Sequence, residues 1–266
     1  MKKLLLLLLA AGSLASCKKT FQYSPNEVRL DENDKDLNAR NIRKIAELPR
    51  KDTFRFIVMG DSQRHYEDTE DFVHAANGLN DIAFVVLAGD ISDFGLNREF
   101  QWIARSLKGL KMPFIGVIGN HDMLANGRLI YSQMFGPENF IFEYSGNQFI
   151  CLNTNSYEVG HDGSLPDLPW LERQLSNHDL YKNAFVISHV PPFDREFDQT
   201  KTAEYSRIVS ATGKVRVSIH GHQHRYSVSR PYPNGPEYLV VGSMARRSFG
   251  LVTVTGTGYR IEEKTF

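Results

Sequence analysis

Clusters of Asp, Asn, Gln and His recur along the chain, each directly after an apolar, strand-like run. In chain order these clusters are Asp61 with Gln63, Asp90 with Asp93, Asn120 with His121 and Asp122, His189, and His222 with His224. Carboxylate oxygens, amide oxygens and imidazole nitrogens are common protein ligands of divalent metals. The set offers enough donors for two metals, with one carboxylate to spare as a bridge, and therefore predicts metal chemistry.

The runs before the clusters are rich in Val, Ile and Phe, which is typical of strands covered on both faces. They are Phe54 to Met59, Ile82 to Ala88, Phe114 to Ile118, Ala184 to Ile187, and Val215 to Ile219. In open α/β sheets, ligands bind just beyond the carboxyl ends of the strands. We therefore expect the five clusters to converge on one crevice.

Helical stretches alternate with these strands, which indicates α/β architecture. The expected helices cover residues 68–80, 97–107, 124–134, 168–178 and 202–211. Two regions depart from the alternation: a hairpin over residues 140–144 and 148–153, and a strand-rich tail over 238–241, 250–255 and 259–263. A second sheet is needed to hold these additional strands.

Five motifs, in order, resemble those of the calcineurin-like metallophosphoesterase family. The family pattern is Asp-x-His, Gly-Asp-x-x-Asp, Gly-Asn-His-(Asp/Glu), a His in an apolar-to-Pro segment, and Gly-His-x-His. This chain has Gly60-Asp61-Ser62-Gln63, Gly89-Asp90-Ile91-Ser92-Asp93, Gly119-Asn120-His121-Asp122, Ser188-His189-Val190-Pro191-Pro192 and Gly221-His222-Gln223-His224. The resemblance implies a four-layer α/β/β/α sandwich with two mixed β-sheets over residues 53–266, and hydrolysis of phosphoric esters.

The resemblance also implies a role for each residue. Asp61, Gln63, Asp90 and His224 would hold a first divalent metal, and Asp90, Asn120, His189 and His222 a second. A hydroxide bridging the two metals would attack phosphorus, and His121 would protonate the leaving group as general acid. Asp122 would fix the tautomer of His121. Asp93 would support the site or cap the following helix.

Gln63 departs from the family pattern, which has His at that position. An amide oxygen is a harder and usually weaker donor than imidazole, so it shifts preference from zinc towards manganese, magnesium or ferrous iron. Alternatively, Gln63 does not bind metal and a water fills the position. Both interpretations remain open from the sequence.

Three basic residues are candidates for contact with the phosphate. Arg64 and His65 follow Gln63 directly, and Arg195 follows the Pro191-Pro192 turn. Arginine suits phosphate oxygens, but exposed basic residues in loops are common without such a role. His220, at the end of a strand, should point away from the ligand face because side chains alternate.

The N-terminus has the pattern of an exported protein. Residues 1–16 resemble a bacterial lipoprotein signal peptide, with Lys2 and Lys3 before a short apolar core. The segment Leu14-Ala15-Ser16 leads to Cys17, which would become the acylated N-terminus and anchor the protein to the membrane, on the periplasmic or cell-surface side. The alternative is an ordinary signal peptide with an incidental Cys. Residues 17–52 are expected to form a tether with a short helix.

The overall charge does not favour a polyanionic partner. Lys plus Arg and Asp plus Glu number 31 each, and basic and aromatic residues do not interleave in a nucleic-acid-binding stripe. The sequence leaves open whether the substrate is a monoester or a diester such as a nucleic acid, a cyclic nucleotide or a phospholipid head group, so a nuclease of the same fold is an alternative. It also leaves open a non-catalytic lipoprotein that binds phosphorylated ligands, and the oligomeric state.

Overall fold

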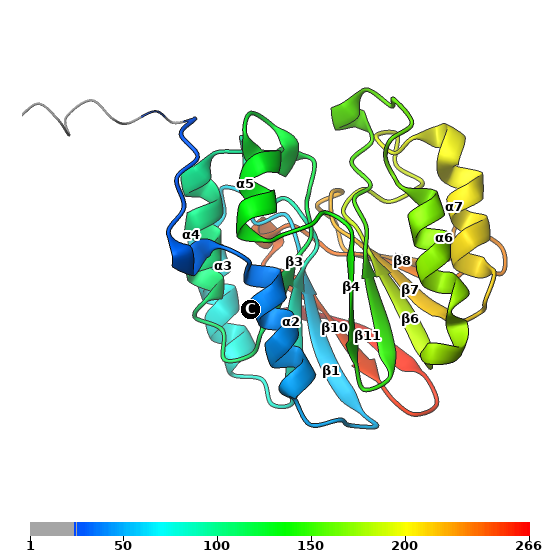
Figure 1. The fold of residues 1–266 in the computed structure, drawn as a ribbon. Helices are drawn as coiled ribbons and strands as arrows, with labels where there is room; N and C mark the ends of the chain where they lie inside the picture. Colours follow the sequence, from blue (N-terminus) through cyan, green and yellow to red (C-terminus); the bar gives the residue numbers. More distant parts are fainter. Residues whose placement is uncertain (1–23, 25) are drawn as a thin grey trace, which may run out of the picture.

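Two mixed β-sheets pack face to face in the computed structural model, which describes residue 24 and residues 26–266 (Figure 1). The first sheet has the order β11-β10-β1-β2-β3, with β1 Phe54–Met59, β2 Ile82–Leu87, β3 Phe114–Gly116, β10 Ser248–Val254 and β11 Tyr259–Thr265. The second has the order β4-β5-β6-β7-β9-β8, with β4 Phe140–Tyr144, β5 Asn147–Cys151, β6 Asn183–Ile187, β7 Val215–His220, β8 Ser227–Ser229 and β9 Glu237–Val240. The hairpin and the tail strands therefore occur as predicted.

The central strands bury both of their faces. In β1, Phe56 and Val58 point into the core between the sheets, whereas Ile57 and Met59 point towards the helices. The ring of Phe56 makes edge contacts with Phe149 and Phe185 of the other sheet, at centroid distances of 5.4 and 5.5 Å. This packing explains why the strand sequences are continuously apolar.

Helices cover the two outer faces and complete the four layers. The first sheet carries α3 Tyr66–Asn77, α4 Asn97–Leu107 and α5 Gly127–Met134, and the second carries α6 Leu168–Ser176 and α7 Thr202–Ser210. Short 3-10 turns are η1 Glu32–Asp34, η2 His121–Met123, η3 Tyr157–Val159, η4 His178–Leu180, η5 Gln199–Lys201 and η6 Met244–Arg246. The predicted α/β/β/α sandwich is confirmed.

Parallel strands in both sheets bring their carboxyl ends to the same end of the domain. Strands β1, β2 and β3 run parallel, as do β5, β6, β7 and β9. A bridge between Gly60, after β1, and Ser243, after β9, joins the two sheets at this end. We call it the site end, because every polar cluster found in the sequence follows one of these strands.

Helix α2, Leu37–Glu47, corrects the expectation of a tether up to residue 52. Leu37 is buried in the core between the first sheet and its helices. Ile45 is buried in the core between the two sheets. The Asn38 amide donates to the carbonyl oxygen of Gly116 at 2.8 Å and accepts from its N–H at 2.9 Å. The short helix exists, but it covers the edge strand β3, so the domain begins before residue 53.

The predicted signal peptide, residues 1–16, and Cys17 lie outside the described residues. Within the part of the chain that the structure describes, no helix has the length and apolar composition required to cross a bilayer.

Candidate metal centre and active site

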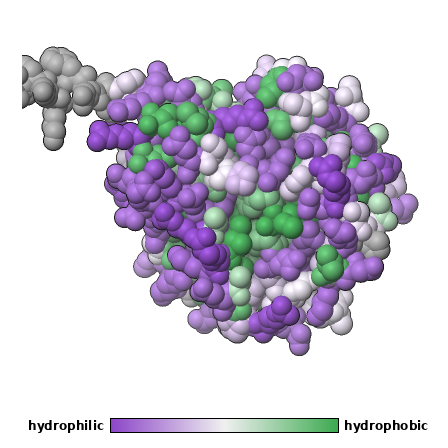
Figure 2. Space-filling view, in the orientation of Figure 1, coloured by the Kyte–Doolittle hydropathy of each residue, from purple (hydrophilic) through white to green (hydrophobic). Residues whose placement is uncertain are grey.

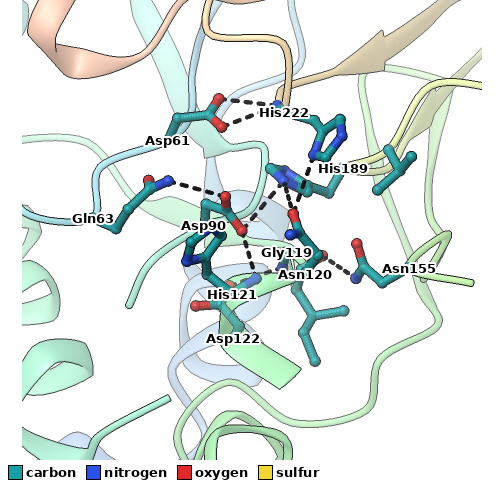
Figure 3. Close-up of polar contacts among 12 residues, drawn as sticks. Asp61, Gln63, Asp90, Gly119, Asn120, His121, Asp122, Asn155, His189 and His222 are labelled. Atoms are coloured by element: carbon teal, nitrogen blue, oxygen red, sulfur yellow. Dashed lines mark hydrogen bonds and ion pairs between the residues drawn. The ribbon is translucent and has the colours of Figure 1, made fainter. Parts of the chain in front are cut away.

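The polar clusters from both sheets meet at the site end (Figure 3). Asp61 and Gln63 follow β1, Asp90 follows β2, and Asn120 follows β3, whereas His189 and His222 follow β6 and β7 of the second sheet. The expected convergence of these side chains is present. It arises because each strand ends in a tight turn at the same edge.

Asp61 connects the two sheets. Its backbone has a φ of 52°, a left-handed conformation that Asp tolerates better than most residues. Its carboxylate accepts from the backbone N–H of His222 at 3.0 and 3.1 Å, and His224 Nε2 lies 3.2 Å from Oδ1. Asp61 is fully buried, while the side chain of His224 is 53% exposed.

Asp90 lies at the centre of the contacts. Its Oδ1 accepts from the His121 backbone N–H at 3.0 Å and lies 3.2 Å from His189 Nε2, and its Oδ2 accepts from Gln63 Nε2 at 3.0 Å. Burial raises the pKa of this carboxyl, but the charge and hydrogen bond of His189 and the nearby His121 lower it overall. Asp90 is therefore the anion that residues from both sheets share.

His189 is oriented for metal binding through Nε2. Its Nδ1 lies 2.7 Å from the carbonyl oxygen of Ala88 and donates to it, which leaves Nε2 directed at Asp90 and at Asn120 Oδ1, 3.0 Å away. Asn120 Oδ1 is also 3.1 Å from His222 Nδ1. Burial opposes the charged form of His189, yet Asp90 raises its pKa to about 10. Asp90 therefore favours positive charge on the groups beside it.

Glycines allow this close approach. Gly89 has a φ of +91°, and a Cβ there would lie 2.3 Å from His189 Nδ1. A Cβ on Gly119 would lie 2.1 Å from the Asp90 backbone nitrogen. Side chains at either position would push the clusters apart, which explains the glycines before Asp90 and Asn120.

The spacing of the donors fits divalent metals. Neighbouring donor atoms on Asp90, His189, Asn120 and His222 are 3.0 to 3.2 Å apart. Two ligand atoms that bind one cation at about 2.1 Å and at right angles are separated by about 3 Å. One ligand atom each from Asp61, Asp90 and His189 also lies within 4.8 Å of the others.

Gln63 has a buried oxygen available for a cation. The side chain is 6% exposed, and among the described residues its Oε1 has no hydrogen-bond partner. Leaving a buried carbonyl oxygen unpaired is unfavourable. A half-turn of the amide would exchange Nε2 for Oε1 beside Asp90. The geometry therefore favours the interpretation in which Gln63 binds metal over the one in which it does not.

The partner of His121 is Asp93, which corrects the role predicted for Asp122. His121 Nδ1 lies 2.7 Å from the Asp93 carbonyl oxygen and 3.6 Å from its Oδ1. The buried Asp122 carboxylate instead accepts from the N–H groups of Ile91, Ser92 and Gly119. Consecutive side chains in the 3-10 turn η2 point about 120° apart, so Asp122 cannot face the same way as His121.

Asp122 stabilises the loops that carry the ligands. Burial, and then repulsion from Asp90, raise the pKa of its carboxyl to about 7. Its four N–H and O–H donors come from the loops after β2 and β3. Sequence reasoning identified the residue as important but assigned it the wrong contact.

The three candidates for substrate contact lie in different surroundings. Arg64 Nε donates to Asp93 Oδ2 at 2.6 Å, and its side chain is 64% exposed, beside the residue that holds His121. His65 pairs locally with Asp68, 3.5 Å away, at the start of α3. Arg195 is exposed in the loop after β6. Of the three, only Arg64 is coupled to the site by a hydrogen bond.

His220 points away from the metal ligands, as expected from alternation. Its Nδ1 lies 3.0 Å from Ser188 Oγ and its Nε2 lies 2.9 Å from Ser218 Oγ. The ring stacks on Tyr238. Burial lowers the pKa of His220 to about 3, so the residue is a neutral part of the core.

Sequence reasoning missed an acidic rim, formed by Glu158, Asp194 and Glu196. His222 Nε2 lies 3.5 Å from Asp194 Oδ1 and 3.5 Å from Glu196 Oε2. Burial and then repulsion from Glu196 raise the pKa of Glu158. The available signal was the run Asp194-Arg195-Glu196, one residue after the Pro191-Pro192 turn, of which only the Arg was considered.

Several known proteins are similar to this chain. A probable cyclic nucleotide phosphodiesterase of Rhodopseudomonas palustris is 27% identical over 189 residues, covering 65% of this chain and 67% of that protein. A probable glycerophosphodiester phosphodiesterase of Arcobacter nitrofigilis is 28% identical over 158 residues, 54% of this chain and 58% of that protein. Both are named as enzymes that act on phosphodiesters.

Solved structures share the fold. A dimetal phosphatase from Danio rerio superposes with a TM-score of 0.62 at 14% identity, covering 80% of this chain and 96% of that one. A purple acid phosphatase from yellow lupin seeds gives 0.64 at 13% identity, covering 82% and 52%. The family model of the calcineurin-like phosphoesterases matches residues 54–226, the segment that contains all five motifs. The chain therefore belongs to the calcineurin-like phosphoesterase family and is a metal-dependent phosphoesterase.

Proposed function

We propose that this protein hydrolyses phosphodiesters at a centre of two divalent metals that share Asp90. Asp61, Gln63, Asp90 and His224 would hold one metal, and Asp90, Asn120, His189 and His222 the other. The metals would be manganese, iron, zinc or magnesium. This assignment is supported by the spacing of 3.0 to 3.2 Å between donor atoms of Asp90, His189 and Asn120, and by the unpaired Gln63 oxygen.

When bound, the metals would neutralise charge on the phosphate and supply hydroxide near neutral pH. The residues of the chain position the reaction around them. His121 is one-third exposed, so it can reach a leaving group in solvent, and the Asp93 carbonyl fixes its Nδ1 as a donor. The protonated ring then carries its second proton on Nε2 and can give it to the departing alkoxide.

The acidic rim is the observation that favours a diester. A phosphate monoester carries nearly two negative charges at neutral pH, whereas a diester carries one. The acidic rim would therefore repel a monoester more strongly than a diester, since Asp194 and Glu196 lie beside His222 and Glu158 is nearby. The names of the similar curated proteins support the same choice.

Hydrolysis of mono- and bis-aryl phosphates, with manganese, magnesium, ferrous iron and zinc supplied separately, tests this proposal. We expect the bis-aryl ester to have the higher kcat/KM. In the doubly substituted Glu158→Gln, Glu196→Gln protein, hydrolysis of the mono-aryl ester should rise relative to the bis-aryl ester. Preference for the monoester in the unchanged protein would contradict the proposal. Absence of turnover with every metal would favour a phospho-ligand-binding lipoprotein.

We also propose that the protein is exported and anchored to the membrane through acylated Cys17. The lipoprotein-like segment ending at Leu14-Ala15-Ser16-Cys17 supports this. Metabolic labelling with an alkyne fatty acid should mark the unchanged protein but not Cys17→Ser. Equal labelling of both, or of neither, would leave the ordinary signal peptide as the explanation.

A further inference from the structure

The N-terminal segment joins the domain at the site end. The Asn126 side chain donates to the carbonyl oxygen of Asn26 at 2.8 Å, and the Asn97 side chain donates to that of Arg29 at 2.9 Å. Asn126 immediately precedes α5, and Asn97 is the first residue of α4. Both helices follow the loops that hold His121 and Asp93. In Figure 1 the dark-blue segment before α2 runs beside α4.

Little chain separates this point from the proposed anchor. Seven Cα–Cα steps lead from Cys17 to Ser24. At no more than about 3.6 Å per residue, they reach about 25 Å. A domain of this length is roughly 45 Å across. An acylated Cys17 therefore holds the site end near the bilayer and cannot bring the opposite end, which carries η4, to it.

Apolar side chains are exposed where the chain leaves the domain. Phe94 is 53% exposed and Leu129 is 51% exposed. Phe94 lies in the loop before α4 and Leu129 in the first turn of α5, and the two segments are in contact, because a Cβ on Gly127 would be 2.7 Å from the Gly95 Cα. Figure 2 shows hydrophobic residues gathered near the start of the N-terminal segment. Such side chains at a membrane-tethered end are typical of an interfacial contact.

Basic residues occur in two places, in the sequence next to the proposed anchor and in the structure next to Phe94. Lys18 and Lys19 directly follow the proposed acylated Cys17 in the sequence, and basic residues next to an anchor add electrostatic attraction to an anionic bilayer. The guanidinium of Arg64 lies 5.5 Å from the centre of the Phe94 ring. An aromatic ring with a cation beside it matches the boundary between acyl chains and phosphate head groups.

We propose that Phe94 and Leu129 form a docking surface for the lipid bilayer, so that the metal centre faces the membrane. This inference rests on the acylation and on the phosphodiesterase activity proposed above. It deepens that function: phosphodiesters displayed at the membrane, such as lipid head groups, have the shortest path to the site.

Tryptophan quenching by brominated lipid tests the orientation. The chain has two tryptophans, Trp102 and Trp170, which are replaced by Phe to give a background without tryptophan. Phe94→Trp then reports on the docking surface. Leu180→Trp is the matched control, since Leu180 is 75% exposed in η4 at the opposite end. The acylated full chain is reconstituted in vesicles of phosphatidylethanolamine and phosphatidylglycerol, with and without brominated chains.

We expect brominated lipid to reduce the fluorescence of the Phe94→Trp protein and to leave that of the Leu180→Trp protein unchanged. Leu129→Trp serves as a second reporter if Phe94→Trp does not fold, as judged by circular dichroism. Equal quenching at both ends, no quenching at the docking surface, or failure to sediment with vesicles would overturn the orientation. Hydrolysis of the soluble bis-aryl phosphate, measured separately without vesicles, shows whether the proposed activity itself fails.

Discussion

The two sheets contribute different chemistry to the site. The loops after β1, β2 and β3 supply oxygen donors from Asp61, Gln63, Asp90 and Asn120, whereas the loops after β6 and β7 supply nitrogen donors from His189, His222 and His224. We call these the oxygen half and the nitrogen half. Each proposed metal takes ligands from both halves, so neither half could form a complete site alone.

The halves also differ in how firmly they are held. Asp61 and Asp90 are almost completely buried and accept hydrogen bonds from backbone N–H groups. In the nitrogen half, His189 is buried, but His224 is more than half exposed. The comparison indicates that packing between the sheets sets the relative position of the two halves. The proposed metal with Gln63 and His224 among its ligands would be held less firmly than the other.

Loss of the shared carboxylate should have the largest effect. Asp90→Asn removes the negative charge that pairs with His189 in the nitrogen half. It also changes the carboxylate oxygen that accepts from Gln63 in the oxygen half. We expect turnover to fall below detection and bound metal to decrease, as measured by hydrolysis assays and elemental analysis. Full metal content in the variant would show that the halves do not meet through Asp90.

Removal of the proposed general acid separates chemistry from metal binding. His121 donates its backbone N–H to the carboxylate of Asp90 and directs its ring towards Asp93. In His121→Gln, kcat should fall by about 10²–10⁴-fold, the usual contribution of acid catalysis. Metal content should stay that of the unchanged protein. If turnover persists, protonation of the leaving group does not depend on His121.

Gln63→His adds a nitrogen donor to the oxygen half. Zinc affinity relative to manganese should rise roughly tenfold or more, which is about 1.4 kcal/mol per factor of ten. Competitive metal titration followed by calorimetry measures this ratio without relying on activity. His224→Gln, which removes a nitrogen from the other half, is the matched control and should shift the ratio in the opposite direction.

A buried residue behind the nitrogen half should affect stability. In His220→Phe, the hydroxyls of Ser188 and Ser218 lose their imidazole partner, at a cost of about 1–3 kcal/mol in the free energy of unfolding. Denaturant unfolding in the presence of a chelator measures this loss in the free energy of unfolding. An unchanged free energy of unfolding at pH 7 would show that the network adds nothing.

The difference in the free energy of unfolding between the unchanged protein and His220→Phe should depend on pH. The pKa of His220 is about 3 when folded and 6.5 in its ordinary state, so between these values only the unfolded chain binds the proton. The stability of the unchanged protein relative to His220→Phe should therefore be greatest above pH 6.5 and decline as the pH falls towards 3. A difference that stays constant over that range would contradict a neutral buried His220.

Arg64→Ala should have the smallest effect. Its ion pair with Asp93 has one strongly exposed partner, so solvent screens the pair and the loss of stability should be small. If Arg64 also contacts phosphate, KM for the bis-aryl ester should rise while kcat changes little. Lys at this position should restore part of the charge effect but not the hydrogen bond from Nε.

The sequence by itself determined the strand ends as the place of the chemistry. Continuous apolar runs can be covered on both faces only inside a layered α/β domain, and polar residues directly after such runs must lie at the strand ends. This local logic predicted the α/β architecture, the convergence of Asp61, Asp90, Asn120, His189 and His222, and the outward turn of His220, while the four-layer sandwich was implied by the resemblance of the five motifs to a known family. It also identified Gln63 as the departure from the family pattern.

Only the tertiary structure decided which neighbours these residues have. The backbone turn at η2 directs the His121 ring to the Asp93 carbonyl oxygen. It directs the Asp122 carboxylate to the backbone N–H groups of the neighbouring loops. The fold places Asp194 and Glu196 next to His222, and it packs α2 onto β3 instead of leaving it as a spacer. These contacts join segments far apart in the chain or depend on the exact direction of a turn, and neither hydrophobic periodicity nor motif spacing carries that information.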